Sequence, residues 1–455
     1  MTYRRNKKHG MTAVGTASAL AIALAMGLTA TFAAGITGDC NGDGMVTVDE
    51  LIIGVNIALE NEPLANCPSF DINGDGAVTV DELIVAVNLA LTGVAPTLTP
   101  TPTPTPTATV PLTPTQTPLP EQFAFVVATD FQTGSFGTVT VDDAHMVTQV
   151  SQSRLLNSDA VGRTYGGLVY VVNRFGGDNI QVLDPSQSFA TLSQCSTGGG
   201  SNPQDIGFVS ATKAYVTLYA EAQLLIANPS ARSDCSDFVL GHIDLSPYAD
   251  SDGIPDMFQV AVVGNRAYVS LQRLTNFTPS IPGLIVVIDT TTDTVVDTIT
   301  LTGENPFGQS KGIPVVDGDL VVSEEGQFGV NDGGIERVDL TSDTALGFFV
   351  TEADLGGDIT DFVLVSEHLG YALISKPDFT ISLVAFDPVA HTVTNTLISG
   401  GNLSDIELDD RGEMFVADRD MAKPGIRIFR ASDGTPITSA PLDLGLPPFD
   451  IVFVP

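Results

Sequence analysis

The stretch YVVNRFGGDNIQVLD, residues 170–184, contains two short β-rich runs, YVVN and IQVLD, separated by a segment of Gly, Asp and Asn. Tyr, Val and Ile favour strands, whereas Gly, Asp and Asn interrupt them. The second run ends in Asp184, whose carboxylate can accept hydrogen bonds from the following backbone and so start a tight turn. The stretch therefore predicts two consecutive strands and a turn.

The same two-strand pattern recurs along residues 121–455, which is the mark of a repeat architecture. The first strand carries an aromatic or β-branched residue at steps of about 44 to 53 residues: Phe125, Tyr170, Tyr215, Tyr268, Val321, Tyr371 and Phe415. The second strand ends in an acid or amide in six repeats: Asp142, Asp184, Asn228, Asp289, Asp339 and Asp387. We assign these terminal residues to turns and give them no functional role.

Seven units of about 48 residues, each long enough for four short strands, predict a mainly β fold, a seven-bladed β-propeller. The first unit lacks an inner strand of its own, whereas the chain ends on an extra strand, PPFDIVFVP. If this C-terminal strand completes the first blade, the ring closes without a free sheet edge. A parallel β-helix is the alternative architecture, but its rungs would be shorter.

The units that contain Tyr170-Val171-Val172-Asn173 and Tyr215-Val216-Thr217 resemble YVTN-type propeller repeats, and NHL-type repeats are a close second. The resemblance covers nearly all of residues 121–455. It implies the propeller fold and leaves the function open, because propellers support many unrelated activities.

Near the N-terminus, the phrase DCNGDGMVTVDELIIGVNIAL (39–59) returns as DINGDGAVTVDELIVAVNLAL (71–91). The pattern D-x-N-x-D-G followed by Glu at position twelve is that of a calcium loop, in which alternate side-chain oxygens and one backbone carbonyl surround the ion. The predicted ligands are Asp39, Asn41, Asp43, Met45, Thr47 and Glu50 in one loop, and Asp71, Asn73, Asp75, Ala77, Thr79 and Glu82 in the other. We therefore expect two Ca²⁺ ions; the alternative is a pair of acidic loops that only cap the following helices.

Each loop runs into a helical pattern, DELIxxxVNxAL, with little room for a helix before it. A duplicated EF-hand-like loop plus exit helix, followed by a Pro/Thr-rich spacer, resembles a type I dockerin. The resemblance implies a small α-helical dockerin-like module over residues 35–95 that docks to a cohesin-like or other surface protein. Glu50 and Glu82 depart from the Asp usual in dockerins, and Val48-Asp49 and Val80-Asp81 replace the small hydroxyl residues that select a cohesin.

Residues 1–34 have a basic start, an apolar stretch and a small-residue end, in the order of a secretory signal peptide. An uncleaved membrane anchor is the alternative, and it is the one expected route to a membrane. Residues 96–120 hold nine Pro and ten Thr, which predicts an extended polyproline spacer. We expect a secreted or cell-surface protein with a signal peptide (1–34), a calcium-loop module (35–95), a linker (96–120) and a propeller (121–455).

The four cysteines are an even set in an exported chain, where disulfides persist. Three connectivities are open, and proximity within each block favours Cys40 with Cys67 and Cys195 with Cys235. The net charge of −35 argues against nucleic acid and anionic membrane surfaces as partners. A cation, a protein or a carbohydrate remains.

An aspartate precedes most of the first strands by about ten to twelve residues, and the C-terminal strand carries an equivalent one; the six are Asp159, Asp205, Asp256, Asp361, Asp405 and Asp450. The fifth unit has QSKGI instead. If these residues begin the innermost strands, six carboxylates surround one mouth of the central channel. They have three interpretations: acceptors for backbone N–H groups, a cation or basic-ligand site, or a catalytic site.

No nucleophile, Walker or zinc motif is present, and the histidines are scattered. We therefore expect a non-enzymatic, exported calcium-binding protein whose propeller is a ligand- or protein-binding platform. The alternative is a propeller hydrolase or lyase that acts on sugars or lactones while docked to an extracellular scaffold, as in polysaccharide degradation.

Overall fold

The computed structural model describes residues 37–41, 45–59, 61–72, 76–79, 82–83, 85–87, 90, 122–232, 234–308 and 313–454. The predicted signal peptide (1–34) and linker (96–120) lie outside these residues. The chain divides into two compact units, Met1–Pro114 and Thr115–Pro455. Within the described ranges, no helix is both long enough and apolar enough to cross a membrane.

The first unit is helical where it is described. It contains α1 (Val48–Ala58) and the short 3-10 helices η1 (Leu64–Asn66) and η2 (Pro68–Phe70). Phe70 is fully buried and packs with Ile57 and Cys67. Its ring lies directly against Gly54, where any Cβ would come within 2.4 Å of the ring. The disulfide Cys40–Cys67, predicted from proximity, is confirmed and ties the first loop to the segment before the second.

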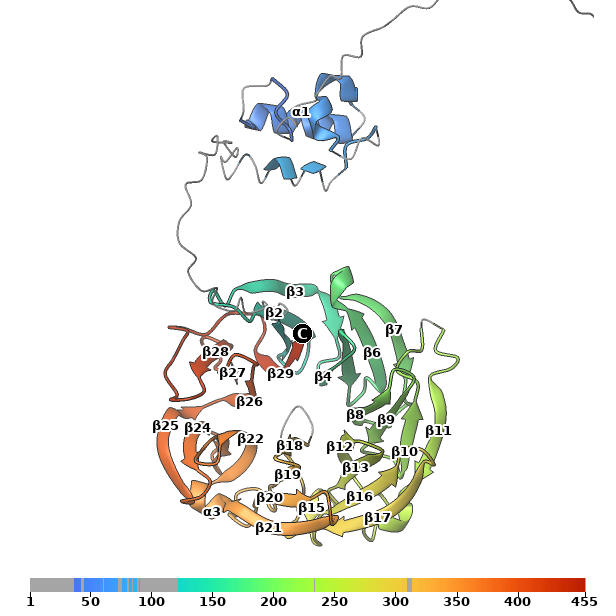
Figure 1. The fold of residues 1–455 in the computed structure, drawn as a ribbon, viewed down its shortest axis with the longest axis vertical. Helices are drawn as coiled ribbons and strands as arrows, with labels where there is room; N and C mark the ends of the chain where they lie inside the picture. The colour runs from blue at the N-terminus through green and yellow to red at the C-terminus, as the bar shows by residue number, and fades with distance from the viewer. Residues whose placement is uncertain are drawn as a thin grey trace, which may run out of the picture. The chain divides into compact units, whose positions relative to one another are not determined.

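The second unit is a seven-bladed β-propeller, as predicted (Figure 1). Each of the first three blades is a four-stranded antiparallel sheet, whose strands follow one another from the innermost outward. Blade one is β29 (Pro448–Val454), β1 (Phe123–Thr129), β2 (Gly134–Thr140) and β3 (Val147–Leu156). Blade two is β4 (Ala160–Tyr165), β5 (Leu168–Asn173), β6 (Asn179–Asp184) and β7 (Ala190–Ser196). Blade three is β8 (Pro203–Ser210), β9 (Lys213–Leu218), β10 (Gln223–Ala227) and β11 (Val239–Asp244).

The next three blades repeat this order. Blade four is β12 (Met257–Val263), β13 (Arg266–Leu271), β16 (Leu284–Asp289) and β17 (Thr294–Thr300), with a small hairpin of β14 (Leu274–Thr275) and β15 (Thr278–Pro279). Blade five is β18 (Val315–Val316), β19 (Asp319–Glu324), β20 (Gly334–Asp339) and β21 (Thr344–Thr351). Blade six is β22 (Asp358–Ser366), β23 (Leu369–Ser375), β24 (Ile381–Asp387) and β25 (Thr392–Gly401). Short helices η3 (Pro185–Gln187), η4 (Ser246–Tyr248) and α3 (Glu352–Leu355) lie in loops.

Blade seven departs from the predicted four strands. It has β26 (Leu403–Leu408), β27 (Glu413–Asp418) and β28 (Gly425–Arg430), and two isolated bridges, Ile426 with Leu442 and Phe429 with Pro436, stand where a fourth strand would run. Pro436 and Pro441 interrupt this segment. Because proline has no N–H to donate, it ends a ladder, and the outer edge of this blade stays irregular.

The ring closes through the C-terminal strand, as the sequence predicts. β29 pairs antiparallel with β1, from Phe123 opposite Val454 to Ala128 opposite Pro448. The last strand of the chain is therefore the innermost strand of the first blade (Figure 1). It supplies the inner strand that the first unit lacks.

The predicted turns after the third strand of each blade are confirmed in six blades. The side chain of Asp289, for example, accepts the N–H groups of Thr291 and Thr292 at 2.8 and 3.0 Å. Equivalent bonds are made by Asp142, Asp184, Asn228, Asp339 and Asp387. The disulfide Cys195–Cys235 is also confirmed, and it links blade two to blade three.

Neighbouring blades are joined by the tyrosines that mark the repeats. Tyr215 is fully buried between blades three and four, and its hydroxyl donates to Asp293 at 2.5 Å. Lys213 reaches the same carboxylate at 2.7 Å. In blade six the hydroxyl of Tyr371 donates to the carbonyl of Ala431 in blade seven at 2.8 Å. The repeated tyrosine therefore connects each of these blades to an outer turn of the next one.

We expect Tyr215→Phe to lower the free energy of unfolding by about 1.5–3 kcal/mol, because it removes a hydrogen bond to a charged carboxylate. Tyr371→Phe, which removes a bond to a neutral carbonyl, should cost about 0.5–1.5 kcal/mol. Urea unfolding of both variants measures the difference. A larger loss for Tyr371→Phe would contradict this account of the repeat.

Candidate functional site

The innermost strand of each propeller blade is paired on one side only. Its N–H groups on the other side need acceptors, because an unpaired buried N–H is costly. Four aspartates supply them across the blade boundary. Asp205 accepts from Val260 at 2.9 Å, Asp361 from Ile406 at 2.9 Å, Asp405 from Ile451 at 2.5 Å and Asp450 from Gly162 at 2.7 Å. We call these four residues the inner ring.

The structure does not bring the other two aspartates of the predicted circle into the inner ring. The matching positions are Val161 in blade two and Gln259 in blade four. In blades three and six a β-bulge adds one residue to the hairpin after the inner strand, and blades two and four have no bulge there. The ring position therefore falls nine residues before the tyrosine in blades two and four, and ten before it in blades three and six.

Asp159 and Asp256 have other partners. Asp159 accepts a hydrogen bond from Arg174 Nε at 2.8 Å. Asp256 has a left-handed backbone, with φ of 49°, and accepts the N–H of Leu274 at 2.7 Å. Burial and the nearby acids raise the pKa of Asp256 to about 6. Neither residue contributes to the inner ring.

One arginine, from blade two, lies between two aspartates of the inner ring in the neighbouring blades. Arg163 Nε donates to Asp205 at 2.7 Å, and its NH1 lies 3.7 Å from Asp450. Burial raises the pKa of Asp450 to about 7 and raises that of Asp405 well above its usual range. Glu407 lies in the same layer and adds negative charge to both groups. The centre of the channel is therefore a buried acidic layer with Arg163 as a counter-charge.

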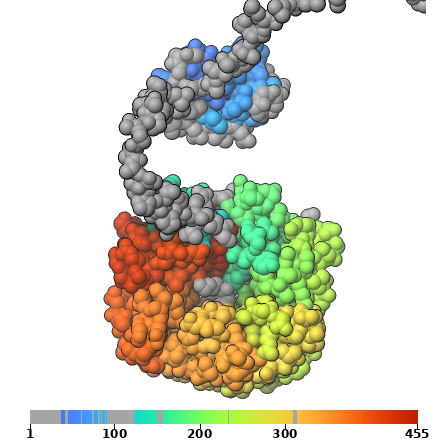
Figure 2. All heavy atoms as spheres, in the orientation of Figure 1, coloured from blue at the N-terminus to red at the C-terminus, as the bar shows by residue number. Residues whose placement is uncertain are grey.

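Arg163 lines two cavities, one on each side of this layer. The larger, of about 560 Å³, lies where the innermost strands begin, and we call it the mouth cavity. Its walls include Phe258, Phe307 and Phe449. Of the six predicted aspartates, Asp159 alone lines it among the described residues. Figure 2 shows the blades arranged around the centre of the ring.

The loops around the mouth cavity carry a rim of exposed apolar side chains. The loop between the second and third strand of each blade holds one large residue: Phe131, Phe175, Tyr219, Phe277, Phe328, Phe379 and Met421 in blades one to seven. Tyr219 is half-buried and the others are exposed, up to 88 % for Met421. These include every exposed phenylalanine among the described residues. We call the seven residues the rim.

Backbone conformation sets part of the rim apart from ordinary loop residues. Phe131, Phe277 and Phe379 have φ of 62°, 60° and 63°, in the left-handed region that bulky residues avoid. An exposed ring in this conformation gains little from burial and has a conformational cost. Such residues are typical of a binding surface. Sequence reasoning missed them, although each rim phenylalanine has Asp, Asn, Arg or Gln directly before it.

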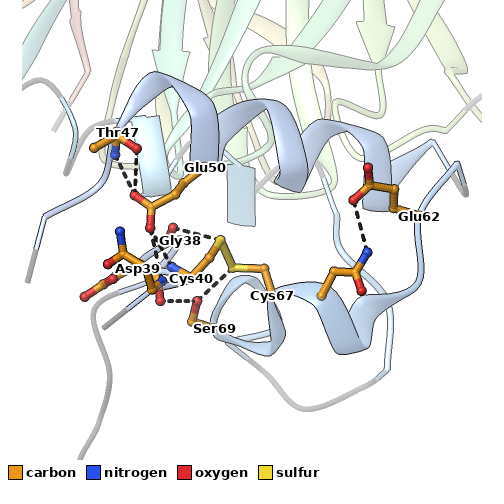
Figure 3. The surroundings of a disulfide bond; sticks show 10 residues. Gly38, Asp39, Cys40, Thr47, Glu50, Glu62, Cys67 and Ser69 are labelled. Atoms are coloured by element: carbon orange, nitrogen blue, oxygen red, sulfur yellow. Dashed lines mark hydrogen bonds between the residues drawn. A yellow bond between two sulfur atoms is a disulfide. The ribbon is translucent and has the colours of Figure 1, made fainter. Parts of the chain in front are cut away.

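In the N-terminal unit, the glutamate at the end of each predicted calcium loop accepts backbone N–H groups from the described part of that loop. Glu50 accepts the N–H groups of Cys40 and Asn41 at 3.0 and 3.2 Å and that of Thr47 at 2.9 Å (Figure 3). Glu82 accepts those of Ile72 and Thr79 at 2.9 and 2.8 Å. In their described residues, the two loops thus share the hydrogen bonds to the final glutamate. Burial acts to raise the pKa of Glu50, but the hydrogen bonds that it accepts outweigh burial and lower the pKa, so that its carboxylate is charged.

The remaining predicted ligands are only partly described. Asp39, Asn41, Met45, Thr47, Asp71, Ala77 and Thr79 belong to the described residues, whereas Asp43, Asn73 and Asp75 lie outside them. Asp71 Oδ2 accepts the N–H of Gly76 at 2.9 Å. Over the described part of the chain, no three His, Cys, Asp or Glu side chains form a metal-binding group. The predicted metal ligands of both loops are all oxygen atoms, and a hard cation prefers oxygen ligands.

The solved structures compared with this chain are distant neighbours in sequence. No protein-family model and no curated protein matches the chain. Among solved structures, a protein from Lactobacillus plantarum has 12% identity and a TM-score of 0.49, over 74% of this chain and 99% of its own. A candidate 6-phosphogluconolactonase from Bacteroides fragilis has 14% identity and a TM-score of 0.48, over 75% and 100%. AztD from Citrobacter koseri has 13% identity and a TM-score of 0.44, over 73% of this chain and 98% of its own. We draw no functional argument from these likenesses.

The inner ring predicts a pH dependence. Folded Asp450 keeps its proton up to about pH 7, whereas in the unfolded chain it loses the proton near 3.8, so its contribution to stability falls as the pH rises between these values. Asp450→Asn should therefore gain about 2–3 kcal/mol relative to wild type between pH 5 and pH 8. Denaturant unfolding at both pH values measures this.

Asp289→Asn is the matched control. Hydrogen bonds from Thr291 and Thr292 lower the pKa of this exposed turn residue. Its contribution to the free energy of unfolding is therefore lost only as the pH falls below about 4. The difference between this variant and wild type should stay constant from pH 5 to pH 8. A flat profile for Asp450→Asn as well would show that Asp450 is ionised throughout.

Proposed function

We propose that this chain is an exported, non-enzymatic binding protein whose propeller presents the rim and the mouth cavity to a partner. The observation that carries the proposal is the rim itself, a large apolar side chain from every blade around one cavity. Exposed aromatic, Met and Arg residues are enriched in interfaces with other proteins. Arg419 is buried and lies 4.6 Å from the ring of Phe131, so it supports this rim residue from within the fold. A surface protein is therefore the preferred partner, and carbohydrate is the alternative.

The N-terminal module supports attachment in this proposal. Its two matching loops bind one Ca²⁺ each, and its helices dock to a partner on the cell surface. The two confirmed disulfides favour an oxidising compartment, which agrees with export. Since the rim belongs to the propeller and the calcium loops to the other unit, binding and attachment involve separate parts of the chain.

The rim proposal is tested with a variant that combines Phe175→Ser, Phe379→Ser and Met421→Ser. None of these side chains lines the mouth cavity, and all are at least 75 % exposed, so the fold should be retained. Immobilised full-length protein is offered a surface-protein fraction and a panel of polysaccharides. We expect the wild type to capture a partner, and we expect the variant to bind that partner at least tenfold more weakly.

The matched control is Val239→Ser with Leu240→Ser, two half-exposed apolar residues on β11, an outer strand away from the rim. It should bind like wild type. If the rim variant and the control retain the same binders, the rim is not the binding surface. If the wild type captures only a polysaccharide and the rim variant does not, the partner is a carbohydrate instead of a protein.

The calcium proposal is tested by titrating the full chain with Ca²⁺. We expect two sites by calorimetry and a thermal transition of the N-terminal unit that a chelator lowers. Asp39→Asn or Asp71→Asn should each remove one site. Asp49→Asn, an exposed acid of the first loop outside the ligand pattern, should remove none. Two sites remaining in the double variant Asp39→Asn/Asp71→Asn would contradict the assignment.

A further inference from the structure

One wall of the mouth cavity is built by two segments of blade five and its neighbour. Glu325 follows β19 directly, and its N–H donates to the carbonyl of Asn305 at 3.0 Å. The N–H of Phe307 donates to Ser323 at 3.1 Å, so residues 305–307 run alongside the end of β19. Asn305, Phe307 and Glu325 all line the cavity.

Two acceptors on this wall have no donor among the described residues. Asn305 donates from its Nδ2 to the carbonyl of Gly326 at 3.2 Å, but its Oδ1 is buried and accepts nothing. The Glu325 side chain is 9 % exposed, and no described group donates to its carboxylate. A buried acceptor without a donor, as Asn305 Oδ1 is, costs about 1–3 kcal/mol, and the Glu325 carboxylate belongs to the lining of the same cavity. The wall is therefore incomplete without a hydrogen-bond donor in the cavity.

The charges nearby show what kind of donor is missing. The two arginines that line the cavity are already paired, Arg163 with Asp205 and Arg174 with Asp159. The titratable groups that face Glu325 are Asp358 and Glu352, which are acids. Burial raises the pKa of Glu325 to about 7, and Asp358 contributes in the same direction. Among the described residues of this wall, a cation is therefore the partner that Glu325 lacks.

The rest of the wall is aromatic. Phe258 and Phe307 stack with ring centroids 5.2 Å apart and planes 29° apart. Leu274 and Ile381 extend the apolar lining. Aromatic faces attract ammonium groups and accommodate an apolar body, and a volume of about 560 Å³ lies in the range of small-ligand sites.

We propose that the mouth cavity binds a small organic amine, whose protonated amino group donates hydrogen bonds to Glu325 and Asn305 Oδ1 while its apolar body lies against Phe258 and Phe307. This inference rests on the proposed function as a binding protein and names the ligand class of the cavity that the rim surrounds. Neutral or anionic ligands would leave the Glu325 carboxylate without a counter-charge.

The test is calorimetric titration of the full-length protein with 2-phenylethylamine, and with 2-phenylethanol as the neutral analogue of the same shape. We expect the amine to bind at least tenfold more tightly than the alcohol. Glu325→Gln should lower the amine affinity at least tenfold and leave the alcohol unchanged. Glu221→Gln, an exposed acid in a rim loop outside the cavity lining, removes the same charge and should have no effect.

A second variant keeps the test valid if Glu325→Gln does not fold. Asn305 has φ of 52°, so Asn305→Gly deletes the amide at a position where glycine is unstrained. This variant should weaken amine binding about three- to tenfold. Amine affinity of the wild type should also rise about tenfold from pH 6 to pH 8, as Glu325 ionises while the amine stays protonated.

The proposal is overturned if the alcohol binds as tightly as the amine, if Glu325→Gln keeps full amine affinity, or if no amine binds at millimolar concentration. The rim variant separates this outcome from a failure of the proposed function. If the rim variant loses the captured partner while no amine binds, only the amine site is wrong. If amine binds but the rim variant retains every partner, only the docking surface is wrong.

Discussion

The propeller depends on satisfying the backbone at its centre, where each innermost strand has neighbours on one side only. Four blades solve this with an aspartate that accepts an N–H group of the next blade. The solution places several carboxylates in a buried layer, and Arg163 compensates part of their charge. These carboxylates are therefore part of the framework. The mouth cavity and the rim lie on one side of this layer, outside the framework that it forms.

Much of the fold follows from local signals in the sequence. Turn acids such as Asp289 act within two or three residues, and a buried tyrosine such as Tyr215 recurs in four of the blades, so both are visible in a single chain. The closing strand could be inferred because a missing inner strand at one end matched a surplus strand at the other. Both disulfides followed from proximity. The seventh blade has three strands instead of the predicted four. This was missed because the strand that Pro436 and Pro441 interrupt can be recognised only from its pairing in the sheet.

The candidate site was less accessible to sequence reasoning. In blades two and four the inner-ring position lies nine residues before the tyrosine, whereas Asp159 and Asp256 lie eleven and twelve residues before it, and this difference shows only in the strand register. Glu325 carries no motif; it becomes notable only because the chain leaves its carboxylate in a cavity without a donor among the described residues. The rim residues lie in loops, where periodicity carries no signal. Their common position becomes evident only when equivalent loops are compared.

The pairing of β29 with β1 has a consequence for biogenesis. The two strands are separated by nearly the whole propeller in sequence, so the first blade lacks its inner strand until the last residues of the chain are available. The other blades can form in order, yet until then the ring stays open and exposes an unpaired strand that invites aggregation. Loss of β29 would therefore disrupt the first blade, which the N-terminal strands of the propeller form, and not the last one.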